Sequence, residues 1–137
     1  MMINVLIDTN VLIYGLDKSS LYHQPAAAIL TLPDLDLFVT TKNISEFFAV
    51  TSKLKLPVKV CQEFYKDLKV NTTILFPTEE SLTIFEQLTR HYRPIGNQVY
   101  DMEIVSIMLA NEVTQVATFN HKDFKGIKEI QIYPITS

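Results

Sequence analysis

Two alternating periodicities constrain the fold of this chain most strongly. Short apolar runs rich in Val and Ile alternate with segments whose apolar residues recur every three or four positions, as in amphipathic helices. The runs predict strands at about residues 3–7, 37–40, 73–76, 115–118 and 130–133. The longer segments predict helices at about residues 10–15, 21–32, 43–53, 58–68, 81–91 and 99–111, with Gly15 closing the first. Such alternation predicts an α/β fold with three layers, α/β/α, around a central, mostly parallel sheet, in a single domain over residues 1–137.

The composition excludes several classes of protein and of metal site. One cysteine and three histidines are too few for an internal disulfide or a structural zinc site, so any metal must be held by oxygen ligands. No apolar run approaches the ~20 residues of a membrane span, and the first residues lack the features of a signal peptide. We therefore expect a cytoplasmic protein with no membrane segment.

Four acidic residues lie where a parallel sheet would collect a ligand. Asp8 follows the first predicted strand, Glu46 lies one turn into the helix after the second, Asp101 opens the helix before the fourth, and Asp123 follows the fourth. Ligands of open α/β sheets bind at the carboxyl ends of the strands. Carboxylates brought together there repel one another unless a cation compensates them, so the pattern predicts a site for a hard divalent metal.

Each acid also has a structural interpretation when it is taken alone. Asp8 is a good helix N-cap, and Asp101 is favourable in the first turn of a helix because of the helix dipole. Glu46 alone fits a solvated helix surface, and Asp123 can close a turn before Phe124. The functional interpretation therefore depends on the four acids as a set.

The acids are carried by four segments in a fixed order. Residues 8–14 read DTNVLIY, residues 43–47 read NISEF, residues 96–101 read GNQVYD and residues 118–124 read TFNHKDF. In order, spacing and chain length these segments resemble the four acidic motifs of PIN domains. The resemblance covers nearly the whole chain, and the first motif is the most distinctive.

The resemblance implies a metal-dependent endoribonuclease that uses Mg²⁺ or Mn²⁺, with Asp8, Glu46 and Asp101 as the main carboxylates and metal ligands. Family members of this length are commonly VapC-like toxins of toxin–antitoxin systems. They work as homodimers and are silenced by a small antitoxin protein. The expected partners are therefore an RNA substrate, a cognate antitoxin and a second copy of the chain.

The fourth acidic position departs from the family pattern. Many PIN domains have an acid at the place of Asn120, which is neutral here, while Asp123 is the nearby carboxylate. Asp123 as a catalytic acid and Asn120 as an alternative ligand through its amide oxygen both remain open. The resemblance also implies residues that orient the acids by hydrogen bonds, namely Thr9, Asn10 and Thr118.

One basic residue is predicted to contact RNA. Arg93 lies in the loop before Asp101 and is our predicted phosphate contact, although an arginine at the end of a helix also caps carbonyl groups. Other basic residues near the motifs, including Lys42 and Lys122, could also contact phosphates, although most of them are expected to be ordinary surface charge. The net charge of −3 is unusual for a nucleic-acid binder unless bound divalent ions reverse the local field.

Rival functions make different demands on the sequence. A haloacid-dehalogenase-like phosphatase would need a second aspartate two residues after Asp8, where Asn10 stands. A receiver domain would place its phosphorylated aspartate after the third strand, where Phe76 and Pro77 follow instead. The remaining alternatives are a degenerate PIN-fold binding module without catalysis, and a nuclease of RNA processing rather than a toxin.

Overall fold

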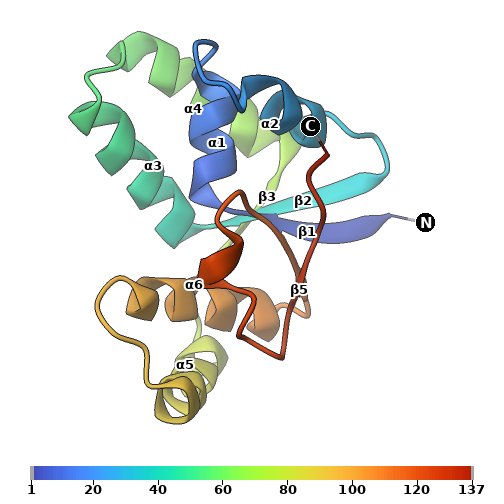
Figure 1. The fold of residues 1–137 in the computed structure, drawn as a ribbon, viewed down its shortest axis with the longest axis vertical. Helices are drawn as coiled ribbons and strands as arrows, with labels where there is room; N and C mark the ends of the chain where they lie inside the picture. Colours follow the sequence, from blue (N-terminus) through green and yellow to red (C-terminus); the bar gives the residue numbers. More distant parts are fainter. Residues whose placement is uncertain (1, 137) are drawn as a thin grey trace.

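The computed structural model describes residues 2–136 and contains one five-stranded sheet (Figure 1). The strands are β1 (Ile3–Ile7), β2 (Leu35–Thr40), β3 (Thr73–Leu75), β4 (Gln115–Ala117) and β5 (Gln131–Ile132). Their order in the sheet is β3-β2-β1-β4-β5, and every neighbouring pair is parallel. The predicted α/β fold is therefore confirmed, with β5 shorter than the sequence pattern indicated.

Six α-helices connect the strands in the part of the chain that the structure describes. They are α1 (Thr9–Leu16), α2 (His23–Leu30), α3 (Thr41–Lys53), α4 (Val58–Asn71), α5 (Glu79–Tyr92) and α6 (Gln98–Ala110), and a 3₁₀ turn, η1, spans His121–Asp123. No helix within residues 2–136 is long and apolar enough to cross a membrane.

Gly15 does not end α1, contrary to the sequence prediction. The helix continues to Leu16, and Asp17 is its C-cap. A Cβ at Gly15 would lie 2.6 Å from Cδ1 of Leu30, so the missing side chain lets α1 approach α2 closely. The glycine therefore serves helix packing rather than helix termination.

The helices cover both faces of the sheet, and each face has its own apolar core. Figure 1 shows α1 to α4 on one side of the strands and α5 and α6 on the other. Along β1, Val5 and Ile7 join the core under α1 to α4, whereas Leu6 joins the core under α5 and α6. Successive side chains of a strand point to opposite faces, so a short run buried at every position needs helices on both faces.

The direction of the connections reverses between β1 and β4. These strands are neighbours in the sheet, pairing Leu6 with Val116 and Ile7 with Ala117, although most of the chain separates them. In open α/β sheets the crevice beyond such a switch point binds ligands. Asp8 follows β1 directly and Thr118 follows β4 directly, so the sequence places polar residues on both sides of this crevice.

Candidate active site

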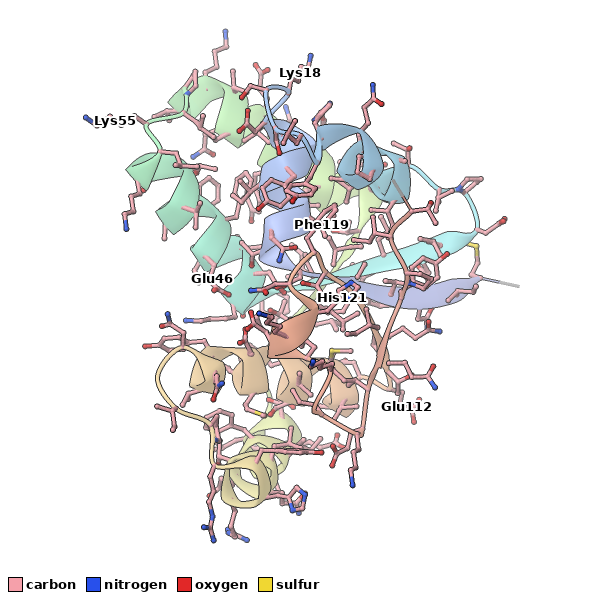
Figure 2. All side chains as sticks on the ribbon, in the orientation of Figure 1. Lys18, Glu46, Lys55, Glu112, Phe119 and His121 are labelled. Carbon is pink, nitrogen blue, oxygen red and sulfur yellow. The ribbon has the colours of Figure 1, made fainter. Side chains whose placement is uncertain are left out.

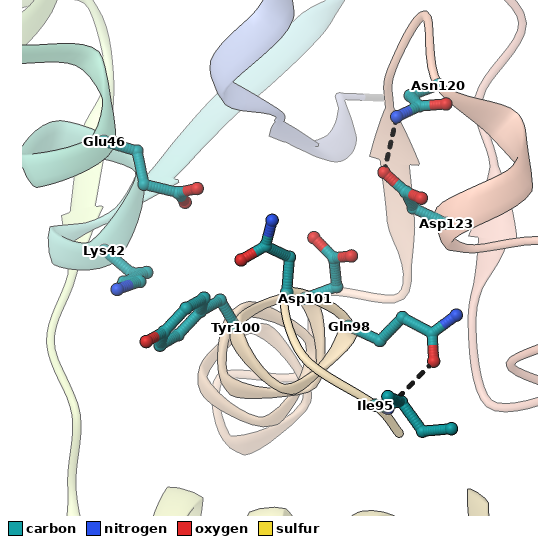
Figure 3. A pocket seen from close by; sticks show the side chains of 9 residues that line it. Lys42, Glu46, Ile95, Gln98, Tyr100, Asp101, Asn120 and Asp123 are labelled. Atoms are coloured by element: carbon teal, nitrogen blue, oxygen red, sulfur yellow. Dashed lines mark hydrogen bonds between the residues drawn. The ribbon is translucent and has the colours of Figure 1, made fainter. Parts of the chain in front are cut away.

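A cavity of about 660 Å³ opens beside the carboxyl edge of the sheet (Figure 3). Helices α3 and α6 and the η1 turn supply its walls. Three acids line it, Glu46, Asp101 and Asp123, while Asp8 lies close enough to raise the pKa of the carboxyls of Glu46 and Asp101. Figure 2 shows Glu46 in the part of α3 nearest α6. The structure therefore gathers the four predicted acids at one edge of the sheet.

Asp8 is held by hydrogen bonds to both carboxylate oxygens. The backbone N–H of Thr9 donates to Oδ1 at 2.8 Å, and the hydroxyl of Thr118 donates to Oδ2 at 2.8 Å. The amide of Asn10 also donates to Oδ2, at 3.3 Å. Asp8 is thus the N-cap of α1 and is also bonded across the crevice to the end of β4, so its structural and functional interpretations are compatible.

Burial nevertheless dominates the protonation of Asp8. Its side chain is only 8% exposed, and desolvation raises the pKa of the carboxyl against the lowering by hydrogen bonds from Thr118 and Thr9. The charge of Asp123 raises the pKa further. A positive charge placed in the crevice would offset both causes of this increase.

A second polar layer supports the residues around Asp8. The hydroxyl of Thr40, the N-cap of α3, accepts from the backbone N–H of Asn43, and the side-chain oxygen of Asn43 accepts from the backbone N–H of Thr40. The amide nitrogen of Asn43 then donates to the hydroxyl of Thr9 at 3.1 Å. Thr40 and Asn43 are both fully buried. This capping box therefore links the start of α3 to the start of α1.

Glu46 is half-buried on α3 and incompletely satisfied. Its Oε1 atom is buried and has no hydrogen-bond partner among the described residues. Desolvation and the neighbouring charge of Asp8 raise the pKa of the carboxyl, while Lys42 lowers it. A buried carboxylate oxygen without a partner is rare, because desolvation of such an atom is costly, and it is the kind of atom that a bound cation satisfies.

Asp101 has a strongly raised pKa. It lies in the first turn of α6, half-buried in the cavity wall. Desolvation, followed by the charges of Asp123, Asp8 and Glu46, raises the pKa of its carboxyl to about 7. Burial and three neighbouring negative charges thus both favour the protonated form of Asp101, and a cation in the cavity would oppose both causes.

Asp123 and Asn120 are bonded to each other at the cavity wall. The amide nitrogen of Asn120 donates to Oδ2 of Asp123 at 2.6 Å, as drawn in Figure 3. Thr118 fixes the backbone of this segment, because its hydroxyl accepts from the backbone N–H of Asn120 at 2.9 Å. Asn120 and Asp123 both line the cavity, and the charge of Asp123 raises the pKa of Asp8 and of Asp101.

The donor set fits a divalent cation. The unpartnered oxygen of Glu46 and the raised pKa of Asp101 both indicate missing positive charge. In residues 2–136, no three His, Cys, Asp or Glu side chains are arranged to hold an ion as they stand. Mg²⁺ commonly takes one or two protein carboxylates and keeps several waters, so it does not need a closed set of three protein ligands.

The other predicted site residues fall into two groups. Thr9, Asn10 and Thr118 form hydrogen bonds around Asp8, as the resemblance implied. Arg93 is exposed at the end of α5, in the left-handed conformation with φ 51°, and is not among the described residues that line the cavity. Its backbone N–H donates to the carbonyl of Thr89 at 2.9 Å, so it caps the helix.

Sequence reasoning missed two features of the site. Asn43 was not assigned a role, although a threonine three residues before it is the spacing of a capping box. Lys42 was named only among several basic residues that could contact phosphates, and its position was not predicted: its ammonium lies 4.0 Å from the centroid of the Tyr100 ring, inside the cavity wall. No local signal joins Lys42 to Tyr100, because they are on different helices.

Comparison with protein families gives one match. The family described as PIN domain matches residues 5–130, which include all four acids. No curated protein matches the chain in sequence.

Solved structures resemble the fold over nearly its whole length. A chain of VapBC2 from Rickettsia felis, crystallised with a DNA fragment from its promoter, has a TM-score of 0.75 at 18% identity, covering 96% of this chain and 98% of that one. The Mycobacterium tuberculosis VapC20, described as a Sarcin-Ricin loop cleaving toxin, has a TM-score of 0.72 at 12% identity, covering 90% and 95%. A toxin–antitoxin complex from Klebsiella pneumoniae has a TM-score of 0.72 at 19% identity, covering 97% and 98%. At these identities the likeness is one of fold.

Proposed function

Because this chain belongs to the PIN domain family, we propose that it is a metal-dependent endoribonuclease that hydrolyses RNA phosphodiester bonds. The observation that carries the proposal is the convergence of three acids on one cavity, with Asp8 close to them and the pKa of Asp101 raised to about 7. A structural ion-pair network would contain its own compensating cations. The charge balance of this cluster instead favours a bound cation and an anionic substrate.

Asp8, Glu46 and Asp101 are the proposed ligands of Mg²⁺ or Mn²⁺, with Asp123 completing the catalytic set. When bound, such an ion acidifies a water and neutralises the charge of a phosphodiester during in-line hydrolysis. Asp8 is held in place for this role by Thr9, Asn10 and Thr118. Asn120 orients Asp123 through their hydrogen bond, and its amide oxygen remains the alternative fourth ligand.

The protonation of Asp101 couples metal binding to pH. With a pKa of about 7, this carboxyl is partly protonated at neutral pH in the absence of a cation. It must lose the proton to act as a ligand, so binding of Mg²⁺ releases protons and strengthens as pH rises through 7.

We also propose the biological setting. One structural neighbour is described as a toxin–antitoxin complex and another as a member of the VapBC family of toxin–antitoxin systems, which supports a VapC-like toxin controlled by a cognate antitoxin protein. A homodimer, in which each copy is a single PIN-like domain over residues 1–137, is the proposed assembly, and the cytoplasm is its proposed location. The alternative of a nuclease for RNA processing shares the same site chemistry and differs in its RNA substrate.

Arg93 remains a predicted phosphate contact.

Cleavage of a mixed cellular RNA preparation by purified protein tests the proposal. We expect discrete products with Mg²⁺ or Mn²⁺ and none with EDTA. The Asp8→Asn and Asp101→Asn variants should each lower the rate at least about a hundredfold, because transition-state stabilisation by a metal amounts to several kcal/mol. Glu86→Gln, an exposed acid on α5, is the matched control and should cleave like the wild type.

The opposite result would favour a binding module. If RNA stays intact with every metal while the folded protein still shows a higher melting temperature in Mg²⁺, the site binds a cation without working as a nuclease. If neither cleavage nor stabilisation by metal occurs, the acidic cluster is not a metal site.

A further inference from the structure

One cation lies in the acidic cavity, and the proposed chemistry does not use it. Among the described residues that line the cavity, Lys42 is the one basic side chain. It is the second residue of α3 and lies four positions before Glu46, so the two side chains share a face of the helix. Its charge lowers the pKa of Glu46, although burial and Asp8 have larger effects in the opposite direction.

The ammonium of Lys42 rests on an aromatic ring. Nζ lies 4.0 Å from the centroid of Tyr100, which comes from α6 on the neighbouring wall. Figure 3 shows the amine beside this ring and apart from the carboxylate of Glu46. A cation on the face of an aromatic ring is stabilised by the ring quadrupole. This contact does not use up the three N–H donors of a lysine ammonium as a pairing with a carboxylate would.

This arrangement keeps a positive charge available next to the acids. A lysine that paired directly with the carboxylates would neutralise them and would compete with a divalent ion for the same oxygens. Tyr100 holds the amine to one side, across the cavity from Asp123, as Figure 3 shows. A cavity of about 660 Å³ is within the range of cavities that hold small ligands, so the acids and Lys42 can contact one bound segment together.

We propose that Lys42 binds a backbone phosphate of single-stranded RNA next to the bond that is cut, and that Tyr100 is the positioning residue for its ammonium. The inference rests on the proposed function and adds a subsite to it. A polyanion entering a cavity lined by Glu46, Asp101 and Asp123 needs a cation besides the metal. Lys42 meets that need through charge-assisted hydrogen bonds to phosphate oxygens.

Binding of a short fluorescein-labelled single-stranded RNA of mixed sequence, measured by anisotropy in EDTA so that no metal-dependent cleavage occurs, tests the subsite. We expect Lys42→Gln to weaken binding about tenfold, as for loss of one charged hydrogen bond. It should also reduce the slope of log affinity against log salt by about 0.7, which corresponds to one phosphate contact on a single strand. Lys42→Arg keeps the charge and should retain most of the affinity.

Two further variants separate the positioning role from general effects. Tyr100→Phe keeps the ring and should bind RNA like the wild type, whereas Tyr100→Leu removes the ring and should weaken binding a few-fold. Lys53→Gln is the control, because Lys53 is an exposed lysine at the far end of the same helix. It should leave both the affinity and the salt slope unchanged within the precision of the measurement.

The outcomes distinguish this inference from the proposed function. Equal affinity and equal salt slope for Lys42→Gln and wild type would overturn the phosphate subsite, even if the enzyme cleaves RNA. A change confined to the pH profile of cleavage would mean that Lys42 acts only on the charge of Glu46. RNA binding that depends on Lys42, in a protein that cleaves no RNA with any metal, would instead overturn the nuclease and keep the subsite. No measurable binding of RNA by the wild type would overturn the subsite as well.

Discussion

Asp8 and Asp101 belong to the same acidic cluster, yet the protein holds them in different ways. Asp8 is fixed by donors from Thr9, Asn10 and Thr118, which belong to two distant parts of the chain. Asp101 stands in the first turn of α6, where other acids raise its pKa to about 7. The first carboxylate is oriented before any ligand arrives, whereas the second is destabilised until one arrives. The contrast separates residues that build the site from those that the ligand must stabilise.

The largest effect on stability should come from removing a hydrogen-bond donor that orients Asp8. Thr118→Val keeps the shape of the side chain but removes a hydroxyl that donates to Asp8 and accepts from Asn10 and from the backbone of Asn120. Because buried Asp8 would lose one of its donors and the backbone N–H of Asn120 would lose its acceptor, we expect the free energy of unfolding to fall by about 2 kcal/mol. Urea denaturation measures this change.

Thr73→Val provides the control for that substitution. Thr73 is exposed on β3, so the same change there should stay within about 0.5 kcal/mol. If Thr118→Val lowers the free energy of unfolding as little as Thr73→Val does, the hydrogen bonds around Asp8 do not hold the edge of the sheet together.

Asp101→Asn should have the opposite sign. Removing the charge relieves repulsion by Asp123, Asp8 and Glu46, so we expect the metal-free protein to gain on the order of 1 kcal/mol at pH 8, a figure reduced because water screens this half-exposed group. In Mg²⁺ the order should reverse, because the wild type gains stability from the ion and the variant gains less.

The pH dependence gives this prediction its sharpest form. The carboxyl of Asp101 has a pKa of about 7 in the folded protein against an ordinary value of 3.8, so the folded state binds the extra proton between these values. Its contribution to stability is therefore complete below about pH 4 and is lost as pH rises through 7. Thermal melts without metal should show wild type and Asp101→Asn diverging over this interval. Parallel curves would mean that the pKa of Asp101 is not raised.

Much of the fold and of the site was predictable because the signals are local. Branched runs predicted the strands, three- and four-residue spacing predicted the helices, and the ends of strands located Asp8 and Thr118. The strand order of the sheet, which was not predicted, then brought the four acids together. These patterns can be recognised in the sequence alone because strand and helix periodicities depend only on residues that are close together in the chain.

The remaining features depend on contacts between distant segments. Gly15 was predicted to close α1, but its role is set by Leu30 on another helix. The bond from Asn43 to Thr9 and the position of Lys42 on Tyr100 depend on how α3 meets α1 and α6. Such contacts are decided by helix packing and side-chain rotamers, and spacing along the chain does not encode them.

The smallest expected effect concerns the two interpretations of Arg93. It occupies a left-handed position at the end of α5, with φ 51°, where glycine is favoured. Arg93→Gly should therefore raise the free energy of unfolding by about 1 kcal/mol, measured by urea denaturation. Arg90→Gly, inside the same helix, should lower it by about 1 kcal/mol.

RNA affinity decides what else Arg93 does. If it contacts a phosphate as the sequence predicted, Arg93→Gly should weaken binding of the labelled RNA while stabilising the fold. An unchanged affinity together with a stability gain would leave Arg93 as a helix cap only.

The pairing of β1 with β4 has a consequence for the time at which activity can appear during synthesis. The site joins Asp8, near the start of the chain, to Thr118 and Asp123, which are made more than a hundred residues later. A growing chain on the ribosome therefore has no complete site until β4 and η1 have emerged and paired with β1. Under the proposed function, the chain therefore cannot cleave RNA while the residues before β4 are being translated, and cleavage becomes possible only after η1 has emerged.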